Sequence, residues 1–262
     1  MIGFIGGGNM AEALIKGMTS QGMKDIFVSE PREERRKELE RTYGVRTSGS
    51  NQEVAGAADI IILAVKPQNM EVVLTEISGD VTAQKTVVSI AAGVTISYLA
   101  ARLRTEKIIR VMPNTPALVQ EGMSVMSLCE CFSGEELNMV RGILMSIGRV
   151  MTLPEKMMNA VTAVSGSGPA FFALFVEAMI AAGEKLGLNA DQARELAVQT
   201  MIGTARLLET GMPPERLRQM VTSPGGTTEA GLKVFEERNL RGIVDDVLSA
   251  ACRRAEELGR RE

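Results

Sequence analysis

The chain has 262 residues, of which 45% are hydrophobic and 23% charged, and its formal net charge is −3. This balance is typical of a soluble globular protein with one large domain or two ordinary ones, and it gives no reason to expect nucleic acid or an anionic membrane as a partner. The sequence contains no histidine, which excludes an imidazole base, a Ser-His-Asp triad and a histidine-ligated metal.

A glycine-rich stretch follows the apolar run of strand type that opens the chain. Gly6, Gly8 and Ala11 stand at the spacing G-x-G-x-x-A, directly before a helical pattern. In a dinucleotide-binding unit the first glycine makes the turn, the second lets the backbone approach a pyrophosphate, and the third small residue lets helix and strand pack closely. The pyrophosphate would lie on the amides of Asn9 and Met10, at the positive end of the helix dipole. A glycine turn that binds nothing is the alternative, and the strand-turn-helix context favours the dinucleotide site.

The first half of the chain alternates between strand and helix patterns. The run 59–65 is continuously apolar, as is typical of a strand buried on both faces of a parallel sheet. Asn51 is a candidate cap for a brief helix, and Pro67 suits the first position of another. The alternation predicts an α/β fold over residues 1–153, a Rossmann-type doubly wound sheet with right-handed crossovers. Further strands are expected at 25–29, 86–90, 107–111, 122–128 and 149–153, with a short one from Val45, and helices at 32–41, 96–104 and 134–146, the last capped by Ser133.

Beyond Pro154 the pattern is helical, so residues 154–262 are expected to form a second domain. The helix expected at 169–186 is almost uncharged and apolar all round, so it should be buried on most sides. Asn189 and Gln192 resemble a capping box at the start of the next helix. A domain of this size with such an apolar helix is a poor monomer, so we expect it to dimerise and to bury that helix against a partner subunit. Further helices are expected at 214–221, from 228, and at the charged C-terminal end.

Ligands of open α/β sheets bind outside the carboxyl ends of the strands. In this sequence several of these ends are short turns that carry glycine or proline, as expected for loops that place backbone groups against a nucleotide. Turn chemistry alone would explain any one of them, and their common edge favours a binding site. The turns are residues 6–10, 29–30, 64–67, 91–93 and 112–116.

Two further turns are rich in backbone amides. Residues 223–228, Ser-Pro-Gly-Gly-Thr-Thr, place two glycines ahead of hydroxyl residues at a helix start, which exposes N–H groups suited to an anion such as a carboxylate. A tight turn with a threonine cap is the alternative. Residues 165–169, Ser-Gly-Ser-Gly-Pro, put another such turn at the start of the apolar helix, and helix capping alone accounts for it equally well.

The cysteines and the hydropathy pattern bear on location. Cys129, Cys131 and Cys252 cannot all be paired, and the first two are too close for a zinc knuckle. We therefore expect three reduced thiols and no metal site.

No apolar run reaches the length of a bilayer span and no signal sequence opens the chain, so a cytoplasmic location and no membrane partner are expected.

The motifs that stand out are GFIGGGNMA (3–11), AVKP (64–67), AAGV (91–94), MPNTP (112–116), SGSGPA (165–170) and SPGGTT (223–228). Together they resemble the pyrroline-5-carboxylate reductase family, in the family's order and over nearly the whole chain. The resemblance implies reduction of the ring imine of 1-pyrroline-5-carboxylate to L-proline with NADH or NADPH, the last step of proline biosynthesis. It also implies a helical domain that interlocks with a second subunit, often within a decamer.

The resemblance assigns roles to single positions. In the substrate loop of Gly226, Thr227 and Thr228, backbone amides would take the carboxylate, and the hydroxyl of Thr228, the catalytic residue, would hydrogen-bond the ring nitrogen. Glu155 matches a position near bound proline. The cofactor-binding positions are Gly6, Gly7, Gly8, Asn9 and Met10 at the pyrophosphate, Ser29, Glu30 and Asn51 near the adenosine ribose, Ala64, Val65, Lys66 and Pro67 beside the nicotinamide ribose, and Ala92, Gly93 and Asn114 at the nicotinamide.

The implied chemistry needs little from the protein. A protonated cyclic imine already accepts hydride well, so the enzyme mainly has to hold the imine carbon of the substrate, which becomes C5 of proline, against C4 of the nicotinamide. No strong acid is required, which fits the absence of histidine. Thr228 would orient the iminium N–H, and its loss should reduce turnover more than the loss of a simple anchor would.

One position departs from the family pattern. Where family members often carry a small or basic pair that accepts the 2′-phosphate of NADPH, this chain has Ser29 and Glu30. A carboxylate there binds the free ribose diol of NADH and repels a phosphate, by about 4 kcal/mol per charge pair at ~4 Å and an effective dielectric of ~20 before screening. Arg32, Arg35 and Arg36 would offset this if they turned inward, although a solvated helix face is their expected role. The sequence favours NADH.

Two alternatives belong to other classes. A hydroxy acid dehydrogenase of related layout uses a lysine four residues after the second glycine of the turn that opens its long helix, where this chain has Phe172. A non-enzymatic dinucleotide-binding sensor would have no use for an intact SPGGTT loop. The sequence leaves open dimer against decamer, acceptance of other cyclic imines and feedback inhibition by proline.

Overall fold

The structure is a computed structural model that describes residues 1–259 except 130 and 133. Its contacts divide the chain into two compact units. Unit 1 comprises Met1–Ser167 and Ala250–Glu262, and unit 2 comprises Gly168–Ser249. The last helix of the chain therefore contributes residues to both units.

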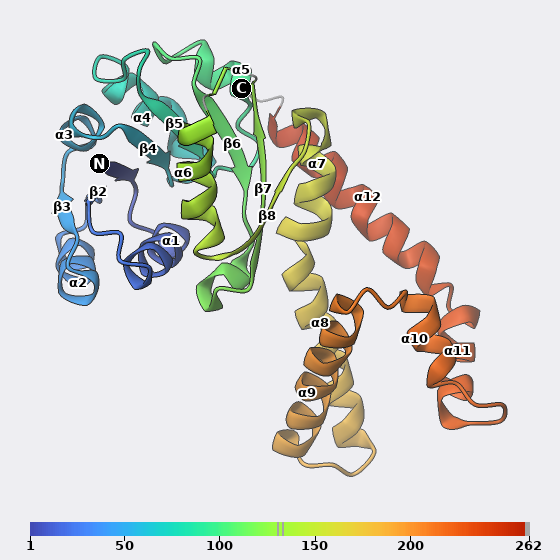
Figure 1. Cartoon of the computed structure of the whole chain (residues 1–262). Coiled ribbons are helices and arrows are strands. Elements are labelled where there is room, and N and C mark those ends of the chain that lie inside the picture. The colour runs from blue at the N-terminus through green and yellow to red at the C-terminus, as the bar shows by residue number, and fades with distance from the viewer. Residues whose placement is uncertain (130, 133, 260–262) are drawn as a thin grey trace. The chain divides into compact units, whose positions relative to one another are not determined.

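Unit 1 is built around an eight-stranded sheet with helices on both faces (Figure 1). The strand order is β3-β2-β1-β4-β5-β6-β7-β8, and the direction of strand addition reverses at β1. Strands β1 to β6 are parallel, as the sequence predicts. The strands are β1 (Ile2–Ile5), β2 (Ile26–Ser29), β3 (Arg46–Ser48), β4 (Ile60–Leu63), β5 (Thr86–Ser89), β6 (Ile108–Met112), β7 (Gly122–Leu128) and β8 (Gly148–Thr152).

The predicted doubly wound sheet is confirmed, with one antiparallel pair that the sequence pattern did not reveal. Strand β7 runs antiparallel to β6, and β8 runs parallel to β7. The connection from β6 to β7 holds only the short 3₁₀ helix η2 (Thr115–Val119). A parallel crossover needs a longer connection, so the chain turns back at this point.

The apolar residues of the sheet form two cores, one on each face. Phe4 and Ile62 point into the core shared with α1, α2 and α6, and Ile5 and Ile61 point into the core shared with α3, α4 and α5. All four residues of β4 are buried, which is why this strand reads as a continuous apolar run. The helices of unit 1 are α1 (Asn9–Ser20), α2 (Glu33–Tyr43), α3 (Asn51–Ala57), η1 (Pro67–Asn69), α4 (Met70–Ile77), α5 (Ile96–Ala100), η2, α6 (Gly134–Met145), η3 (Glu155–Met157), α7 (Met158–Val161) and η4 (Thr162–Gly166).

Three details of local structure differ from the sequence analysis or fall outside the described residues. Ser50, not Asn51, caps α3, because its side chain accepts the N–H of Glu53. The expected amide-rich turn at 165–169 is instead a helical segment, in which the π-helical turn η4 leads almost directly into α8. The predicted cap Ser133 lies outside the described residues.

The prediction of three reduced cysteines is wrong for two of them. Cys129 and Cys131 are joined by a disulfide, and Cys252 is free. The prediction rested on the odd number of cysteines and on a spacing too close for a zinc knuckle, and neither argument excludes a bond between the two near neighbours. Their Cα atoms lie 5.3 Å apart, within the usual range for a disulfide.

Unit 2 is entirely helical in the residues described. Asn189 and Gln192 form the predicted capping box: the Asn189 side chain accepts the N–H of Gln192 at 2.9 Å, and the Gln192 side chain accepts the N–H of Asn189 at 3.1 Å. Its helices are α8 (Gly168–Lys185), α9 (Ala190–Glu209), α10 (Pro214–Met220), α11 (Thr227–Glu237) and the first part of α12 (Leu240–Gly259).

Lys85 has an unusually complete set of partners for a lysine. Its ammonium donates to the carbonyl oxygens of Ala55, Gly56 and Ala58 at 2.6, 2.7 and 2.8 Å, and so closes the C-terminal end of α3. We expect Lys85→Met to lower the free energy of unfolding by about 2 kcal/mol, because three carbonyls lose a charged donor. Urea denaturation measures this. Lys24→Met, at an exposed lysine, is the control, and its free energy of unfolding should stay within about 0.5 kcal/mol of the parent's. An equal loss of stability in both variants would show that Lys85 does not hold the end of α3.

Candidate active site

The turn from β1 to α1 has the geometry of a phosphate-binding turn. Gly6 has φ of +101°, and a Cβ there would lie 2.9 Å from the carbonyl oxygen of Ala64, so only glycine fits. Gly8 is the N-cap of α1 and provides no side-chain cap, and a Cβ there would meet nothing within 4 Å. The turn is therefore packed against the sheet at Gly6 and open at Gly8. The unpaired amides of the first helical turn, among them those of Asn9 and Met10, suit a pyrophosphate.

Glu30 lies at the end of β2 and is buried, with only 5% of its surface exposed. Its Oε2 accepts the N–H of Gly7 at 3.2 Å, and its Oε1 accepts the backbone N–H and the Nε of Arg32 at 3.1 and 2.8 Å. Burial alone would raise the pKa of this carboxyl, but the hydrogen bonds from Arg32 and Gly7 outweigh it and hold the pKa below its usual value. Glu30 is therefore ionised at neutral pH and touches the glycine turn directly.

Arg35 differs from the expectation of a solvated helix face. Its side chain is only 13% exposed, and its Nε donates to the carbonyl oxygen of Gly7 at 2.9 Å. Its other nitrogens pair with Glu12 at 2.5 Å and with Glu38 at 2.8 Å. The carboxylate of Glu12 on α1 pairs with Arg35 of α2, and the Arg35 guanidinium in turn hydrogen-bonds the backbone of the glycine turn at Gly7. The sequence analysis did not identify that role.

Ser29 and Asn51 meet beside Glu30. The Ser29 hydroxyl donates to Oδ1 of Asn51, and Nδ2 of Asn51 donates to Glu76 at 2.6 Å. Arg36 donates to the carbonyl oxygen of Glu30 at 2.8 Å. The structure thus brings together the residues that the resemblance assigns to the adenosine ribose, at the end of the second strand.

The loops after β4 and β5 lie next to the glycine turn, because all three follow the carboxyl ends of neighbouring parallel strands. Ala64 donates its N–H to Ile5 at 2.9 Å, which places the loop 64–67 next to the end of β1. Gly93 has φ of +83°, and a Cβ there would lie 3.3 Å from Cβ of Leu258 in α12. The last turn of α12 therefore packs on the loop that holds Ala92, a contact between distant segments that no local pattern predicts.

Asn114 fixes the loop that follows β6. Its Oδ1 accepts the N–H of Met123 at 2.8 Å, and its Nδ2 lies 3.3 Å from both the carbonyl oxygen and the hydroxyl of Ser165. One amide side chain thus links the ends of β6, β7 and the π-helical turn η4. π-helical turns within helices are frequent at functional sites.

Glu155 is bound to two groups of unit 1. Its Oε1 accepts the N–H of Ile96, the first residue of α5, at 2.9 Å and Arg110 at 3.1 Å. The side chain of Arg110 is 7% exposed and that of Glu155 is 31% exposed. Arg110 was not among the predicted site residues, although a charged residue inside the apolar run Ile-Ile-Arg-Val-Met was a signal for it. This ion pair ties the start of α5, next to the loop 91–93, to the segment that leads to α7.

We expect Glu155→Gln to lower the free energy of unfolding by about 1–2 kcal/mol, because the buried Arg110 loses its counter-charge while Glu155 is partly solvated. Urea denaturation monitored by circular dichroism measures the change. Glu71→Gln, on the exposed face of α4, is the matched control and should have no effect. A Glu155→Gln chain as stable as its parent would show that the pair does not hold this part of unit 1.

The SPGGTT segment joins α10 to α11 within unit 2. The N–H of Gly225 donates to Glu229 at 2.7 Å, and the N–H of Gly226 donates to the carbonyl oxygen of Ser223 at 3.0 Å. The predicted anion site therefore has fewer free amides than expected, because the N–H groups of Gly225 and Gly226 are already bonded within the chain. The N-cap Gly226 provides no side-chain cap, so the amides at the start of α11, from Thr227, are the ones suited to a carboxylate. A cavity of about 760 Å³ lies beside this turn.

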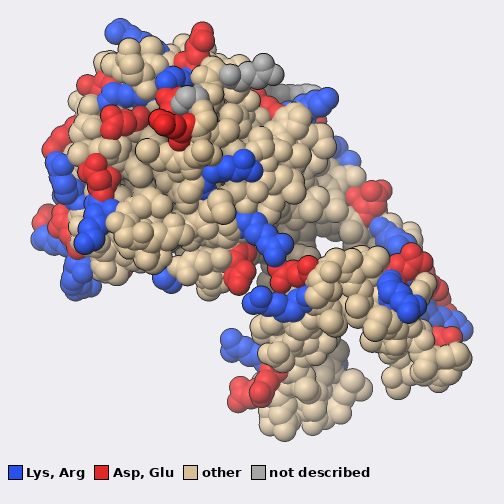
Figure 2. All heavy atoms as spheres, viewed as in Figure 1, with Lys and Arg blue, Asp and Glu red and all other residues tan. Residues whose placement is uncertain are grey.

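The helices of unit 2 leave much apolar surface uncovered. Phe172 and Leu174 of α8 are 63% and 65% exposed, and the face over α8 and α9 seen in Figure 2 is mostly uncharged. The helical stretch Glu155–Lys185 is long and apolar enough, with a mean hydropathy of 1.5, to cross a membrane by length and composition alone. This corrects the expectation that no run is long enough, because the helical turns before Pro169 extend the apolar helix. Other exposed apolar side chains of unit 2 include Phe175, Met179, Leu196, Ile202, Leu207, Val234, Phe235, Ile243 and Val244.

These features define a dinucleotide-dependent oxidoreductase of the Rossmann type. They are the doubly wound sheet, the glycine turn that is open at Gly8, the carboxylate at the end of the second strand and the apolar helical unit. The chain is 41% identical over 264 residues to a pyrroline-5-carboxylate reductase of Synechocystis sp., and the match covers 99% of this chain and 98% of the relative. It belongs to the pyrroline-5-carboxylate reductase family.

Domain families and solved structures agree with this assignment. Residues 155–258 match the family described as pyrroline-5-carboxylate reductase dimerisation, and residues 1–93 match NADP oxidoreductase coenzyme F420-dependent. A pyrroline-5-carboxylate reductase from Coxiella burnetii superposes with a TM-score of 0.91 at 38% identity, covering 98% of this chain and 97% of the other. The Plasmodium falciparum pyrroline carboxylate reductase, solved with NADP bound, gives 0.89 at 32% identity over 98% and 97%. The predicted family and fold are confirmed.

Proposed function

We propose that this chain reduces 1-pyrroline-5-carboxylate to L-proline, the last step of proline biosynthesis. The observation that carries the proposal is its similarity to pyrroline-5-carboxylate reductases over nearly the whole length, in a chain whose pyrophosphate turn is open. The purified chain should consume NADH or NADPH when 1-pyrroline-5-carboxylate is present and form an equal amount of L-proline. A folded chain that binds dinucleotide but consumes none would contradict the proposal.

The cofactor is NADH or NADPH, and the residues of unit 1 fit it. When bound, the reduced nicotinamide supplies a hydride to the ring carbon of the imine. The amides at the start of α1 would hold the pyrophosphate, and Glu30 and Asn51 would bind the adenosine ribose. The loops 64–67 and 92–93, together with Asn114, would hold the nicotinamide end. The remaining proposed contacts are Gly6, Gly7, Gly8, Asn9, Met10 and Ser29.

The substrate would bind through the start of α11. The amides of Thr227 and Thr228 lie at the positive end of the helix dipole and would receive the carboxylate. Gly226, whose N–H is bonded to Ser223, would line the site as the N-cap of α11. The hydroxyl of Thr228 would accept the iminium N–H and orient the ring. Glu155 is proposed as a substrate-binding residue near bound proline, as the resemblance implies, and its Oε1 is held by Ile96 and Arg110.

The cofactor preference rests on Glu30. Its Oε2 accepts one hydrogen bond within the chain and keeps a lone pair for a ribose hydroxyl. A 2′-phosphate would instead meet a buried carboxylate whose pKa lies below its usual value and which therefore carries its charge at neutral pH. The proposal is a preference for NADH, with Arg32 held as the counter-ion of Glu30 and not as a phosphate ligand.

We expect kcat/KM to be higher with NADH than with NADPH, and Glu30→Gln to shift the ratio toward NADPH by about tenfold or more. Removing the charge abolishes a repulsion of about 4 kcal/mol before screening, while the amide can still accept the N–H of Gly7. Steady-state kinetics with both cofactors measures the ratio. Glu34→Gln, on the exposed side of α2, should leave it unchanged, and a parent enzyme that favours NADPH would refute the preference.

The assembly and location follow from the same assignment. Unit 2 leaves large apolar side chains exposed on α8, α9 and α11, and a second copy of the chain is the partner that the dimerisation match suggests. The interlocked dimer, its possible arrangement in a decamer and a cytoplasmic location are part of the proposal. So is a division of labour between a dinucleotide domain, 1–153, and a dimerisation and substrate-binding domain, 154–262.

A further inference from the structure

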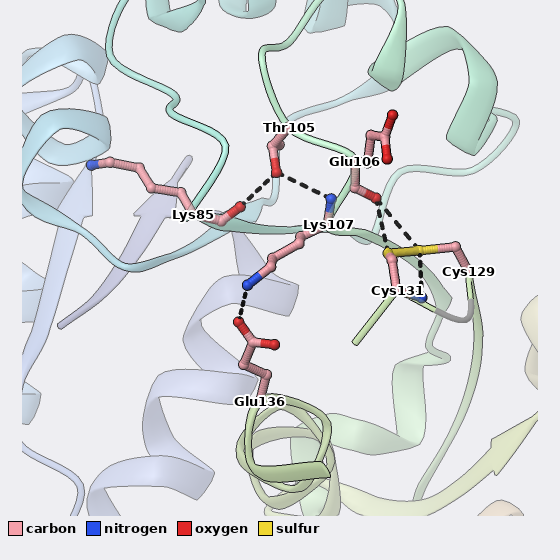
Figure 3. The surroundings of a disulfide bond; sticks show 7 residues. All are labelled: Lys85, Thr105, Glu106, Lys107, Cys129, Cys131 and Glu136. Atoms are coloured by element: carbon pink, nitrogen blue, oxygen red, sulfur yellow. Dashed lines mark hydrogen bonds and ion pairs between the residues drawn. A yellow bond between two sulfur atoms is a disulfide. The ribbon is translucent and has the colours of Figure 1, made fainter. Parts of the chain in front are cut away.

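Cys129 and Cys131 form a compact sulfur site that the proposed reaction does not use (Figure 3). Cys129 follows β7, and Leu128 at the end of that strand pairs with Ile109 near the start of β6. Because β7 is antiparallel to β6, the pair lies beside the amino ends of the parallel strands. The proposed cofactor site lies at the carboxyl ends of these strands, on the opposite side of unit 1.

This disulfide constrains the folded chain very little. The two cysteines are separated by only 2 positions in the sequence, and the gain in stability from a cross-link falls as the closed loop shortens. The two cysteines are also linked by a hydrogen bond, since the N–H of Cys131 donates to Sγ of Cys129 at 3.4 Å. A bond that is not needed for the fold can open and close without unfolding it.

The surroundings accommodate both redox states. The carbonyl oxygen of Glu106 lies 3.6 Å from Sγ of Cys129 and 3.4 Å from Sγ of Cys131 (Figure 3). A thiol can donate to this oxygen, whereas a disulfide has no proton to give. The same backbone arrangement therefore serves the reduced pair, with Glu106 as the acceptor, and the bonded pair.

The two sulfurs differ in access and in leaving ability. Cys131 is exposed and lines a cavity of about 500 Å³ together with Arg104 and Lys107, whereas Cys129 is partly buried. An incoming thiolate can therefore reach Sγ of Cys131 more easily. Sγ of Cys129 is then the leaving group, and the N–H of Cys131 stabilises it as a thiolate.

We propose that Cys129 and Cys131 are a reversible dithiol–disulfide site that exchanges with low-molecular-weight thiols. A thiolate RS⁻ attacks Cys131, the Cys129–Cys131 bond breaks, and Cys129 leaves as a thiolate. A second RS⁻ attacks the R sulfur of the mixed disulfide, which releases Cys131 as a thiolate and forms RSSR. The protein pair gains two electrons, and the protons of the two RSH molecules pass to the two cysteines; RSSR drives the reverse reaction.

The test uses the full chain with Cys252→Ser, so that the pair holds the only thiols. The folded protein is equilibrated in mixtures of reduced and oxidised glutathione, alkylated and analysed by peptide mass spectrometry. The fraction of disulfide should rise continuously with the oxidised share. With Cys129→Ser added, the glutathione adduct on Cys131 should exceed that of the intact pair by about tenfold, because no second thiol resolves it. Cys131→Ser is the matched variant and should trap less, because Cys129 is less accessible.

Three results would overturn the proposal. A pair that stays bonded in excess dithiothreitol while the chain remains folded would be a permanent cross-link. A pair that stays fully reduced in oxidised glutathione alone would not be a redox site. A Cys129→Ser chain that traps no adduct would show that Cys131 is closed to thiol exchange.

Discussion

Replacing Gly8 by Asp should abolish dinucleotide binding and leave the fold intact. Gly8 is the N-cap of α1 with φ of −74° and ψ of −176°, which any residue can adopt, and a Cβ there meets nothing within 4 Å. Aspartate is a favoured N-cap, so the helix gains a few tenths of a kcal/mol. The same carboxylate would occupy the place proposed for the pyrophosphate and repel it by about 4 kcal/mol at ~4 Å, which is about a thousandfold in affinity.

Calorimetric titration with NADH measures the affinity, and urea denaturation measures the stability. Gly79→Asp is the matched control, because Gly79 is exposed and a Cβ there, as at Gly8, meets nothing within 4 Å. This control should bind NADH as the parent does. A Gly8→Asp chain that binds NADH normally would mean that the pyrophosphate does not lie on α1.

Replacing Thr228 by Ala should lower kcat for imine reduction by about a hundredfold, the usual size of the loss when one positioned hydrogen-bonding group is removed from a reacting centre. Thr228 is the second residue of α11 and is partly exposed. Alanine is a better helix former than threonine, so α11 should not be weakened. The affinity for NADH should not change, since the proposed cofactor residues all belong to unit 1.

Thr228→Ser separates a chemical role of the hydroxyl from packing of the methyl group. Serine keeps the oxygen, so it should restore most of the turnover that alanine loses. Steady-state kinetics at saturating NADH gives kcat and KM for each variant. Equal turnover of the alanine variant and the parent would remove Thr228 from the catalytic role, and equal loss in both variants would assign the effect to packing.

The sequence predicted best those features that short stretches of chain determine. The glycine turn, the buried strand β4 and the capping box at Asn189 each depend on residues only a few positions apart, and the structure has all three. The antiparallel direction of β7 was missed, because strand patterns carry no sign of direction. The Cys129–Cys131 bond was missed because a spacing rule for metal ligands does not describe a tight turn.

Contacts between distant segments were the larger omission. Arg110 and Glu155 are 45 positions apart, and Arg35 and Gly7 are 28 apart. Their pairing depends on which strands and helices become neighbours, and that is a property of the whole sheet. The sequence could nonetheless mark Arg110 as unusual, since a buried charge in an apolar strand needs a partner.

The most direct test of the central claim is to follow the hydride itself. The purified chain is supplied with 1-pyrroline-5-carboxylate and with NADH that carries deuterium in both positions at C4 of the nicotinamide, and the proline is analysed by mass spectrometry and NMR. We expect L-proline with a single deuterium at C5 of the ring. Unlabelled proline, or none from a folded chain that binds NADH, would contradict it.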